Sequence, residues 1–86
     1  MEVYRTKTFG KMYKKLPRKI QVQFEARLEL FLQYPTHPIL HVHSLLGEYE
    51  DMWSMNVTGD YRALFYKDNE TVVIFALIGT HSELYG

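Results

Sequence analysis

The sequence contains no cysteine, which excludes disulfide bonds and thiolate-ligated metal sites as sources of stability. No apolar run approaches the roughly 18 residues that a membrane-spanning helix needs. The first residues, Met-Glu-Val-Tyr-Arg-Thr-Lys, lack the charged and then apolar segments of a secretory signal. Repeats, low-complexity segments and linkers are also missing. We therefore expect a soluble cytoplasmic protein that does not associate with a membrane.

Large apolar residues are present in sufficient number for a core, since 47% of the 86 residues are hydrophobic and 15% are aromatic. A chain of this size buries only about 60 to 65% of its unfolded surface, which is too little to divide between two cores. We expect a single domain that spans residues 1–86 and folds without a metal or another cofactor.

The charges balance to a net charge of zero, which by itself argues against a nucleic-acid-binding protein. Their distribution is uneven, however, because seven of the ten basic residues lie within the first nineteen positions, where Glu2 is the only acid. This asymmetry allows one face of the protein to bind phosphate groups, and Lys11, Lys14 and Lys15 are the candidate contacts. The alternative interpretation is an ordinary solvated helix surface.

The first half of the chain predicts one strand and two helices. A short strand is expected around Val3, followed by a helix that Thr8 caps and that runs to about Leu16. Pro17 suits the first turn of a second helix, which ends near Tyr34 because prolines follow. Apolar residues recur along it at helical spacing, at Ile20, Phe24, Leu28 and Phe31.

The second half predicts three strands, because apolar residues alternate in the segments 53–57, 61–66 and 72–78. The turn residues between them make these strands antiparallel neighbours, and the last strand is apolar on both faces, as expected of a central strand. Thr80 and Glu83 then form a capping box that starts one helical turn. The expected fold is α+β, with the order β-α-α-β-β-β, an antiparallel sheet packed by an N-terminal helical hairpin, and a short C-terminal turn.

His81 is the most informative candidate for chemistry, because it stands where the last strand ends and the capped turn begins. Imidazole exchanges protons near neutral pH, and the backbone amides that open a helix attract anions such as phosphate. The position therefore favours proton transfer beside a bound anion. The alternative is that His81 only caps or packs at the strand end.

The other three histidines suggest a zinc site as a further alternative, since His41 and His43 are two residues apart and His37 is near. The segment lacks the thiolates, closely spaced carboxylates and four-residue helical spacing typical of zinc ligands. We therefore expect no metal.

Arg62 lies in an otherwise apolar strand, where its side chain must snorkel to solvent, pair with Asp60 or Glu83, or face a ligand. A guanidinium group fits a phosphodiester and can offset charge that develops on it. Tyr61 and Tyr85 stand near the ends of their elements and could stack on unpaired bases.

Three stretches of the sequence together resemble the RelE/ParE toxin superfamily, and most closely its YafQ-like branch. They are His43-Ser44-Leu45-Leu46-Gly47, Asp60-Tyr61-Arg62-Ala63-Leu64-Phe65-Tyr66 and Gly79-Thr80-His81-Ser82-Glu83-Leu84-Tyr85-Gly86. The resemblance implies the toxin of a type II toxin–antitoxin system, an endoribonuclease that cleaves messenger RNA without metal, commonly in the A site of a translating 70S ribosome. It also implies a cognate antitoxin protein as partner and no small-molecule ligand.

The resemblance further implies roles for individual residues. In YafQ-like toxins the histidine that matches His81 is catalytic, the residues that match His43 and Asp60 belong to the same site, and the aromatic residue that matches Tyr85 lines it. Arg62 resembles the strand arginine that contacts the scissile phosphate in RelE-like members. Our hypothesis is that His81 is the general acid and that His43, aided by Asp60, is the general base, although these roles could be exchanged.

Two positions depart from the YafQ-like pattern. Asn56 stands where those toxins carry another histidine, and Tyr61 stands where they carry tryptophan. Asparagine cannot exchange a proton near pH 7. Two alternative functions stay open. One is a ParE-like inhibitor of DNA gyrase without nuclease activity, since the same fold supports both functions. The other is a catalytically degenerate module that only binds an antitoxin, which the zero net charge and Asn56 favour.

Overall fold

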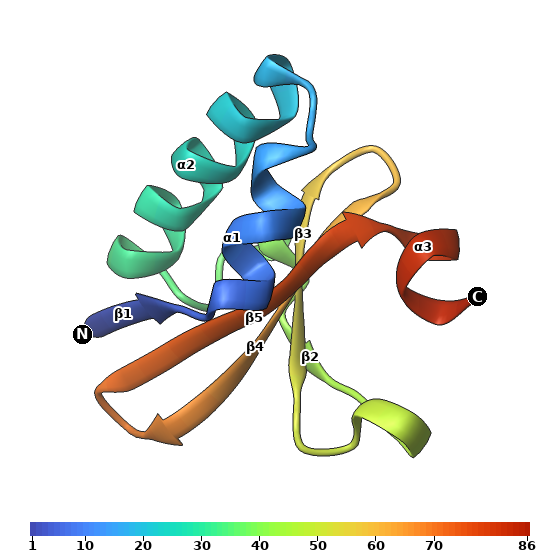
Figure 1. Ribbon diagram of the computed structural model, residues 1–86. Coiled ribbons are helices and arrows are strands. Elements are labelled where there is room, and N and C mark those ends of the chain that lie inside the picture. The colour runs from blue at the N-terminus through green and yellow to red at the C-terminus, as the bar shows by residue number, and fades with distance from the viewer.

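The structure, a computed structural model, describes residues 1–86 as a five-stranded sheet with two helices on one face and a helical turn beyond its last strand (Figure 1). In chain order the elements are β1 (Glu2–Arg5), α1 (Lys7–Lys14), α2 (Arg18–Gln33), the 3₁₀ helix η1 (Pro38–Leu40), β2 (His43–Ser44), the 3₁₀ helix η2 (Gly47–Tyr49), β3 (Trp53–Thr58), β4 (Tyr61–Asn69), β5 (Val72–Thr80) and α3 (His81–Tyr85). No helix is both long and apolar enough to cross a membrane.

The sheet has the strand order β1-β5-β4-β3-β2. The three predicted strands form antiparallel neighbours, and β5 is an interior strand with β1 on one side and β4 on the other. Two features differ from the prediction. β1 pairs with β5 in parallel, because these strands come from opposite ends of the chain and are not joined by a hairpin. The predicted connection also contains the two-residue strand β2, which is too short to produce a periodic pattern.

Helix α1 begins two residues earlier than predicted, because Thr6 and not Thr8 is its N-cap. The Thr6 hydroxyl accepts a hydrogen bond from the backbone N–H of Phe9 at 3.0 Å. The same hydroxyl donates to the carbonyl oxygen of Ala76 on β5 at 3.3 Å. This contact with the sheet gives Thr6 an advantage over Thr8 that the local sequence does not contain.

The two faces of the sheet carry separate cores. On the helix face, the main cluster contains Phe9 of α1, three residues of α2 and the inward side chains of β3, β4 and β5. On the opposite face, Leu84 of α3 packs in a smaller cluster with Met52, Leu64 and Ala76. A register shift places Leu64 opposite Leu77 but Phe65 opposite Phe75, so Ala76 bulges out of the ladder and joins the smaller cluster.

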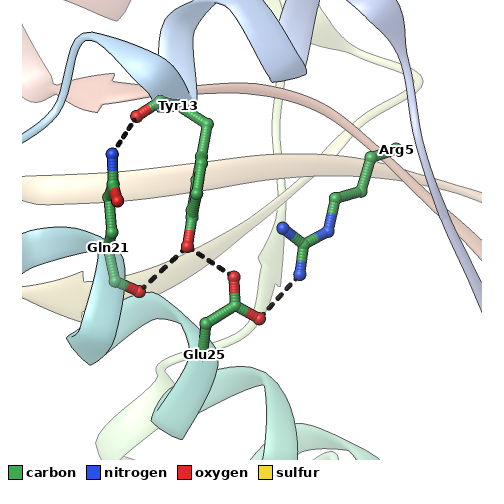
Figure 2. Close-up of polar contacts among 4 residues, drawn as sticks. All are labelled: Arg5, Tyr13, Gln21 and Glu25. Atoms are coloured by element: carbon green, nitrogen blue, oxygen red, sulfur yellow. Dashed lines mark hydrogen bonds and ion pairs between the residues drawn. The ribbon is translucent and has the colours of Figure 1, made fainter.

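A polar network joins β1 and the two helices at the edge of the main core (Figure 2). Arg5 donates to the Glu25 carboxylate at 2.7 Å, and the Tyr13 hydroxyl donates to the same carboxylate at 2.6 Å. Burial raises the pKa of Glu25, but these two donors outweigh it and the net shift of the pKa is downward. The Arg5 guanidinium also lies 5.1 to 5.7 Å from three aromatic ring centres. The network fixes α1 and α2 relative to the edge of the sheet.

Candidate functional site

The C-terminal turn presents His81 as the first residue of α3, on an exposed position. The predicted capping box is confirmed: the Glu83 amide donates to the Thr80 hydroxyl at 3.2 Å, and the Thr80 amide donates to the Glu83 carboxylate at 2.8 Å. These bonds from Thr80 lower the pKa of Glu83. The backbone N–H of His81 donates to the Asp60 carbonyl oxygen at 3.0 Å. His81 is therefore held to the β3–β4 turn as well as to β5.

Three aromatic rings follow one another beside this turn. The ring centres of His81 and Tyr85 are 4.6 Å apart, and those of Tyr85 and Tyr49 are 5.7 Å apart in an edge-to-face arrangement. The Tyr49 hydroxyl donates to the Leu84 carbonyl oxygen at 2.7 Å. Burial, with smaller contributions from Glu48 and Tyr85, raises the pKa of Tyr49.

Tyr49 was not a candidate from the sequence, because it lies in a short 3₁₀ helix within an irregular connection. Neither periodicity nor a motif marks it there. Only the packing of η2 against α3 shows its contact with the C-terminal turn.

Arg62 lies on the sheet face opposite the main core. It forms no ion pair, since the only ion pair in the protein joins Arg5 and Glu25, so the expected alternative of pairing with Asp60 or Glu83 is wrong. Its guanidinium instead donates to the carbonyl oxygens of Gly59 and Tyr61, at 2.9 and 3.0 Å. A guanidinium group held by backbone oxygens keeps its positive charge uncompensated.

Asn56 is the direct cross-strand neighbour of Arg62, and Gly79 of β5 flanks Arg62 on the other side. The amide oxygen Oδ1 of Asn56 is shielded from solvent and has no hydrogen-bond partner within the protein. An unpaired acceptor of this kind costs about 1–3 kcal/mol of desolvation. Asn56 thus lies beside the uncompensated guanidinium with its amide oxygen unpaired.

His43 occupies β2, opposite the buried Ser54 of β3. Cross-strand partners share a face of the sheet, so His43, Ser54 and Leu64 lie on the face of the smaller core. Three strand spacings separate β2 from β5, which is about 14 Å across the sheet. Asn56 and Arg62 lie on the two strands between. The two histidines therefore stand on opposite sides of the Asn56–Arg62 pair.

Comparison with solved structures gives close matches over almost the whole chain. YafQ from E. coli has a TM-score of 0.83 at 16% identity, and the match covers 99% of this chain and 98% of that one. The DinJ–YafQ toxin–antitoxin complex of E. coli gives 0.78 at 18% identity, with 99% and 97% covered. The RelB–RelE antitoxin–toxin complex of Methanococcus jannaschii gives 0.67 at 20% identity, with 95% and 94% covered. This chain has the fold of the YafQ and RelE toxins. A scan against protein-family models gives no match, and neither does a comparison with curated protein sequences.

Within this YafQ-type fold, the predicted site residues fall into groups. His81, Tyr85 and Asp60 are in direct contact through rings or backbone, and Arg62 pairs with Gly79, two residues before His81. His43 shares their face of the sheet at a greater distance. Tyr61 does not join them, because it packs against the main core on the helix face, and successive residues of a strand point to opposite faces.

The candidate lysines Lys11, Lys14 and Lys15 lie at the C-terminal end of α1 and are exposed. Basic side chains there also stabilise the helix dipole, so their position alone does not require a ligand. Their neighbour Met12 packs against both core clusters, including the one that contains Leu84. The basic end of α1 therefore adjoins the cluster that supports α3.

Three histidines considered for zinc do not form a metal site. No group of three or more His, Asp or Glu side chains is arranged to hold a metal ion, and His37 Nδ1 accepts a hydrogen bond from the Ile39 amide. Two pockets of about 730 and 910 Å³ indent the surface, and neither includes His81, Asp60 or Arg62.

Proposed function

We propose that this chain is the toxin of a type II toxin–antitoxin pair and that it cleaves messenger RNA by proton transfer between histidines and the ribose-phosphate chain. The observation that carries the proposal is the Arg62 guanidinium, which has no acidic partner and lies beside Asn56 on the sheet face between His43 and His81. The fold that the chain shares with YafQ, RelE and their antitoxin complexes supports the toxin role.

The proposed reaction begins when His43 takes the proton of a ribose 2′-hydroxyl. The 2′-oxygen attacks the adjacent phosphorus, the bond from phosphorus to the 5′-oxygen breaks, and His81 gives a proton to the departing 5′-oxygen. The products are a 2′,3′-cyclic phosphate and a 5′-hydroxyl end. Arg62 offsets the charge on the phosphate oxygens in the transition state.

Two further features suit an RNA strand that crosses this face. The Tyr85 ring lies against His81 at an interplanar angle of 49° and is 39% exposed, so it can contact an unpaired base. The lysines at the end of α1 would attract backbone phosphates, whereas the acidic residues around η2 would repel them. This difference in charge favours an RNA path that reaches α3 from the side of α1. In the proposed function the RNA is a message bound to the ribosome.

The first test is to express the chain in bacterial cells, with and without the product of the neighbouring reading frame, and to map transcript ends. The proposal predicts growth arrest, cut transcripts with 5′-hydroxyl ends, and rescue by the neighbour as antitoxin. His81→Gln should lower cleavage by about 10² to 10⁴. Ser82→Ala, on the next exposed position of α3, is the matched control and should cut normally.

Two other outcomes would redirect the assignment. DNA damage and filamentation with intact transcripts would indicate a ParE-like gyrase inhibitor. A harmless chain that still binds its antitoxin would indicate a degenerate module, an alternative favoured by Asn56 because an amide cannot exchange protons. A folded His81→Gln protein that cuts message as fast as the wild type would contradict the proposed mechanism.

A further inference from the structure

The segment before β2 holds His43 by a contact that the sequence did not reveal. His43 Nδ1 lies 2.8 Å from the backbone carbonyl oxygen of His41. The two imidazole rings also lie against each other, with their centres 4.7 Å apart. His41 itself has a φ of 44° and is the only residue other than glycine with a left-handed backbone.

The direction of this hydrogen bond follows from the chemistry of its two atoms. A carbonyl oxygen can only accept, so Nδ1 of His43 must carry the hydrogen. In the neutral ring the other nitrogen, Nε2, then holds the free lone pair. When the ring gains a proton it does so at Nε2, and the bond from Nδ1 to His41 persists in both states.

We propose that His41 is a positioning residue that fixes the Nδ1-protonated tautomer of His43, so that Nε2 of His43 is the proton acceptor of the site. This inference rests on the proposed ribonuclease function and names the atom of His43 that would take the proton from the 2′-hydroxyl. The group that positions His43 is the backbone carbonyl of His41. The imidazole ring of His41 only restricts the rotation of the His43 ring.

The left-handed conformation of His41 gives the proposal a backbone-based test. Glycine adopts this conformation without cost, whereas a β-branched residue is strongly disfavoured there. His41→Gly removes the ring and keeps the carbonyl direction, while His41→Val drives the backbone out of the left-handed region and moves the carbonyl. Thr36→Val, a change to the same residue in the same segment but outside the left-handed position, is the matched control.

The experiment is nitrogen NMR of the histidine rings in the isolated chain, with kcat and KM measured in parallel on a ribosome-bound message. In the wild type, neutral His43 should carry its hydrogen on Nδ1, and His41→Gly should keep that pattern. His41→Val should shift the hydrogen toward Nε2 and lower kcat by about two- to tenfold, the range expected for one lost hydrogen bond, with little change in KM. Thermal unfolding would verify that each variant is folded.

The outcomes separate this inference from the proposed function. Neutral wild-type His43 with its hydrogen on Nε2 would overturn the inference, whether or not the chain cleaves RNA. So would a His41→Val protein with a displaced tautomer and an unchanged kcat, because position would then have no effect on the reaction. If the wild type cuts no RNA, the proposed function fails, and the NMR result still decides whether His41 fixes the His43 tautomer.

Discussion

Replacing Thr80 with valine should loosen the turn that carries His81, because it removes the capping hydroxyl while keeping the shape of the side chain. The hydroxyl accepts from the Glu83 amide at 3.2 Å, and the Glu83 carboxylate accepts from the Thr80 amide at 2.8 Å. Helix α3 has only five residues, so these two bonds are a large part of what orders it. The other anchors are the buried Leu84 and the bond from Tyr49.

The loss of an N-cap hydroxyl costs about 1 kcal/mol, within a range of about 0.5–2 kcal/mol. In a domain of this size, 1 kcal/mol lowers Tm by roughly 4–8 °C. If the same free energy separates the ordered turn from a frayed one, the ratio of ordered to frayed turn falls about fivefold, from roughly 5:1 to 1:1. The population with His81 in place, and cleavage with it, then falls to about 60% of the wild-type level. Thr80→Ser keeps the hydroxyl and is the matched control.

Calorimetry or circular dichroism would measure Tm, and hydrogen exchange at the Gly86 amide would report the turn itself. That amide donates to the Ser82 carbonyl oxygen at 2.9 Å, so it exchanges faster when α3 frays. A Thr80→Val protein with the Tm and the Gly86 exchange rate of Thr80→Ser would refute the reasoning, because the capping hydroxyl would then contribute nothing to the turn.

Three further predictions concern stability and metal dependence. Tyr49→Phe leaves the Leu84 carbonyl without its donor and should lower the free energy of unfolding by about 1 kcal/mol. Tyr34→Phe is the control, because Tyr34 is exposed and forms no side-chain hydrogen bond, and it should leave the free energy of unfolding unchanged. Urea titration measures this free energy for both variants. Because the pKa of Glu25 is lowered in the folded state, its contribution to stability is present above the unfolded pKa of about 4.3 and is lost as the pH falls through the folded pKa. The Tm difference between wild type and Glu25→Gln should therefore shrink between pH 7 and pH 3, and a constant difference would argue against the shift. Finally, the purified protein should cut ribosome-bound message at the same rate before and after the protein is dialysed against EDTA and returned to assay buffer. If dialysis abolished cleavage and added zinc restored it, the proposed metal-independent mechanism would be wrong.

The extent to which the sequence predicted the fold differs between local and long-range features. The apolar spacing of α2 and the alternation in β3, β4 and β5 predicted those elements, since burial of one face produces a visible period. The parallel pairing of β1 with β5 was not predicted, because it joins the two ends of the chain. The choice of Thr6 over Thr8 as the cap of α1 has the same cause, since the Ala76 carbonyl that favours Thr6 lies 70 residues away.

The candidate site also has features that local sequence predicts and features that only the tertiary structure shows. The position of His81 at a capped turn could be derived from the spacing of Thr80 and Glu83, because a capping box joins residues three apart. The sequence did not reveal that Arg62 lacks an acidic partner, or that Tyr49 supports the turn. These properties depend on strand register and on where a connection folds back.

The sequence by itself therefore determined the class of fold, the core helix, the apolar strand β5 and the capped histidine, because each depends on a pattern among residues a few positions apart. Only the tertiary structure decided which groups face one another across the sheet: Asn56 beside Arg62, Tyr61 on the opposite face, and the His41 carbonyl on His43. The physical reason is that side-chain direction on a strand changes with every residue, so a register that local patterns do not fix decides which side chains meet.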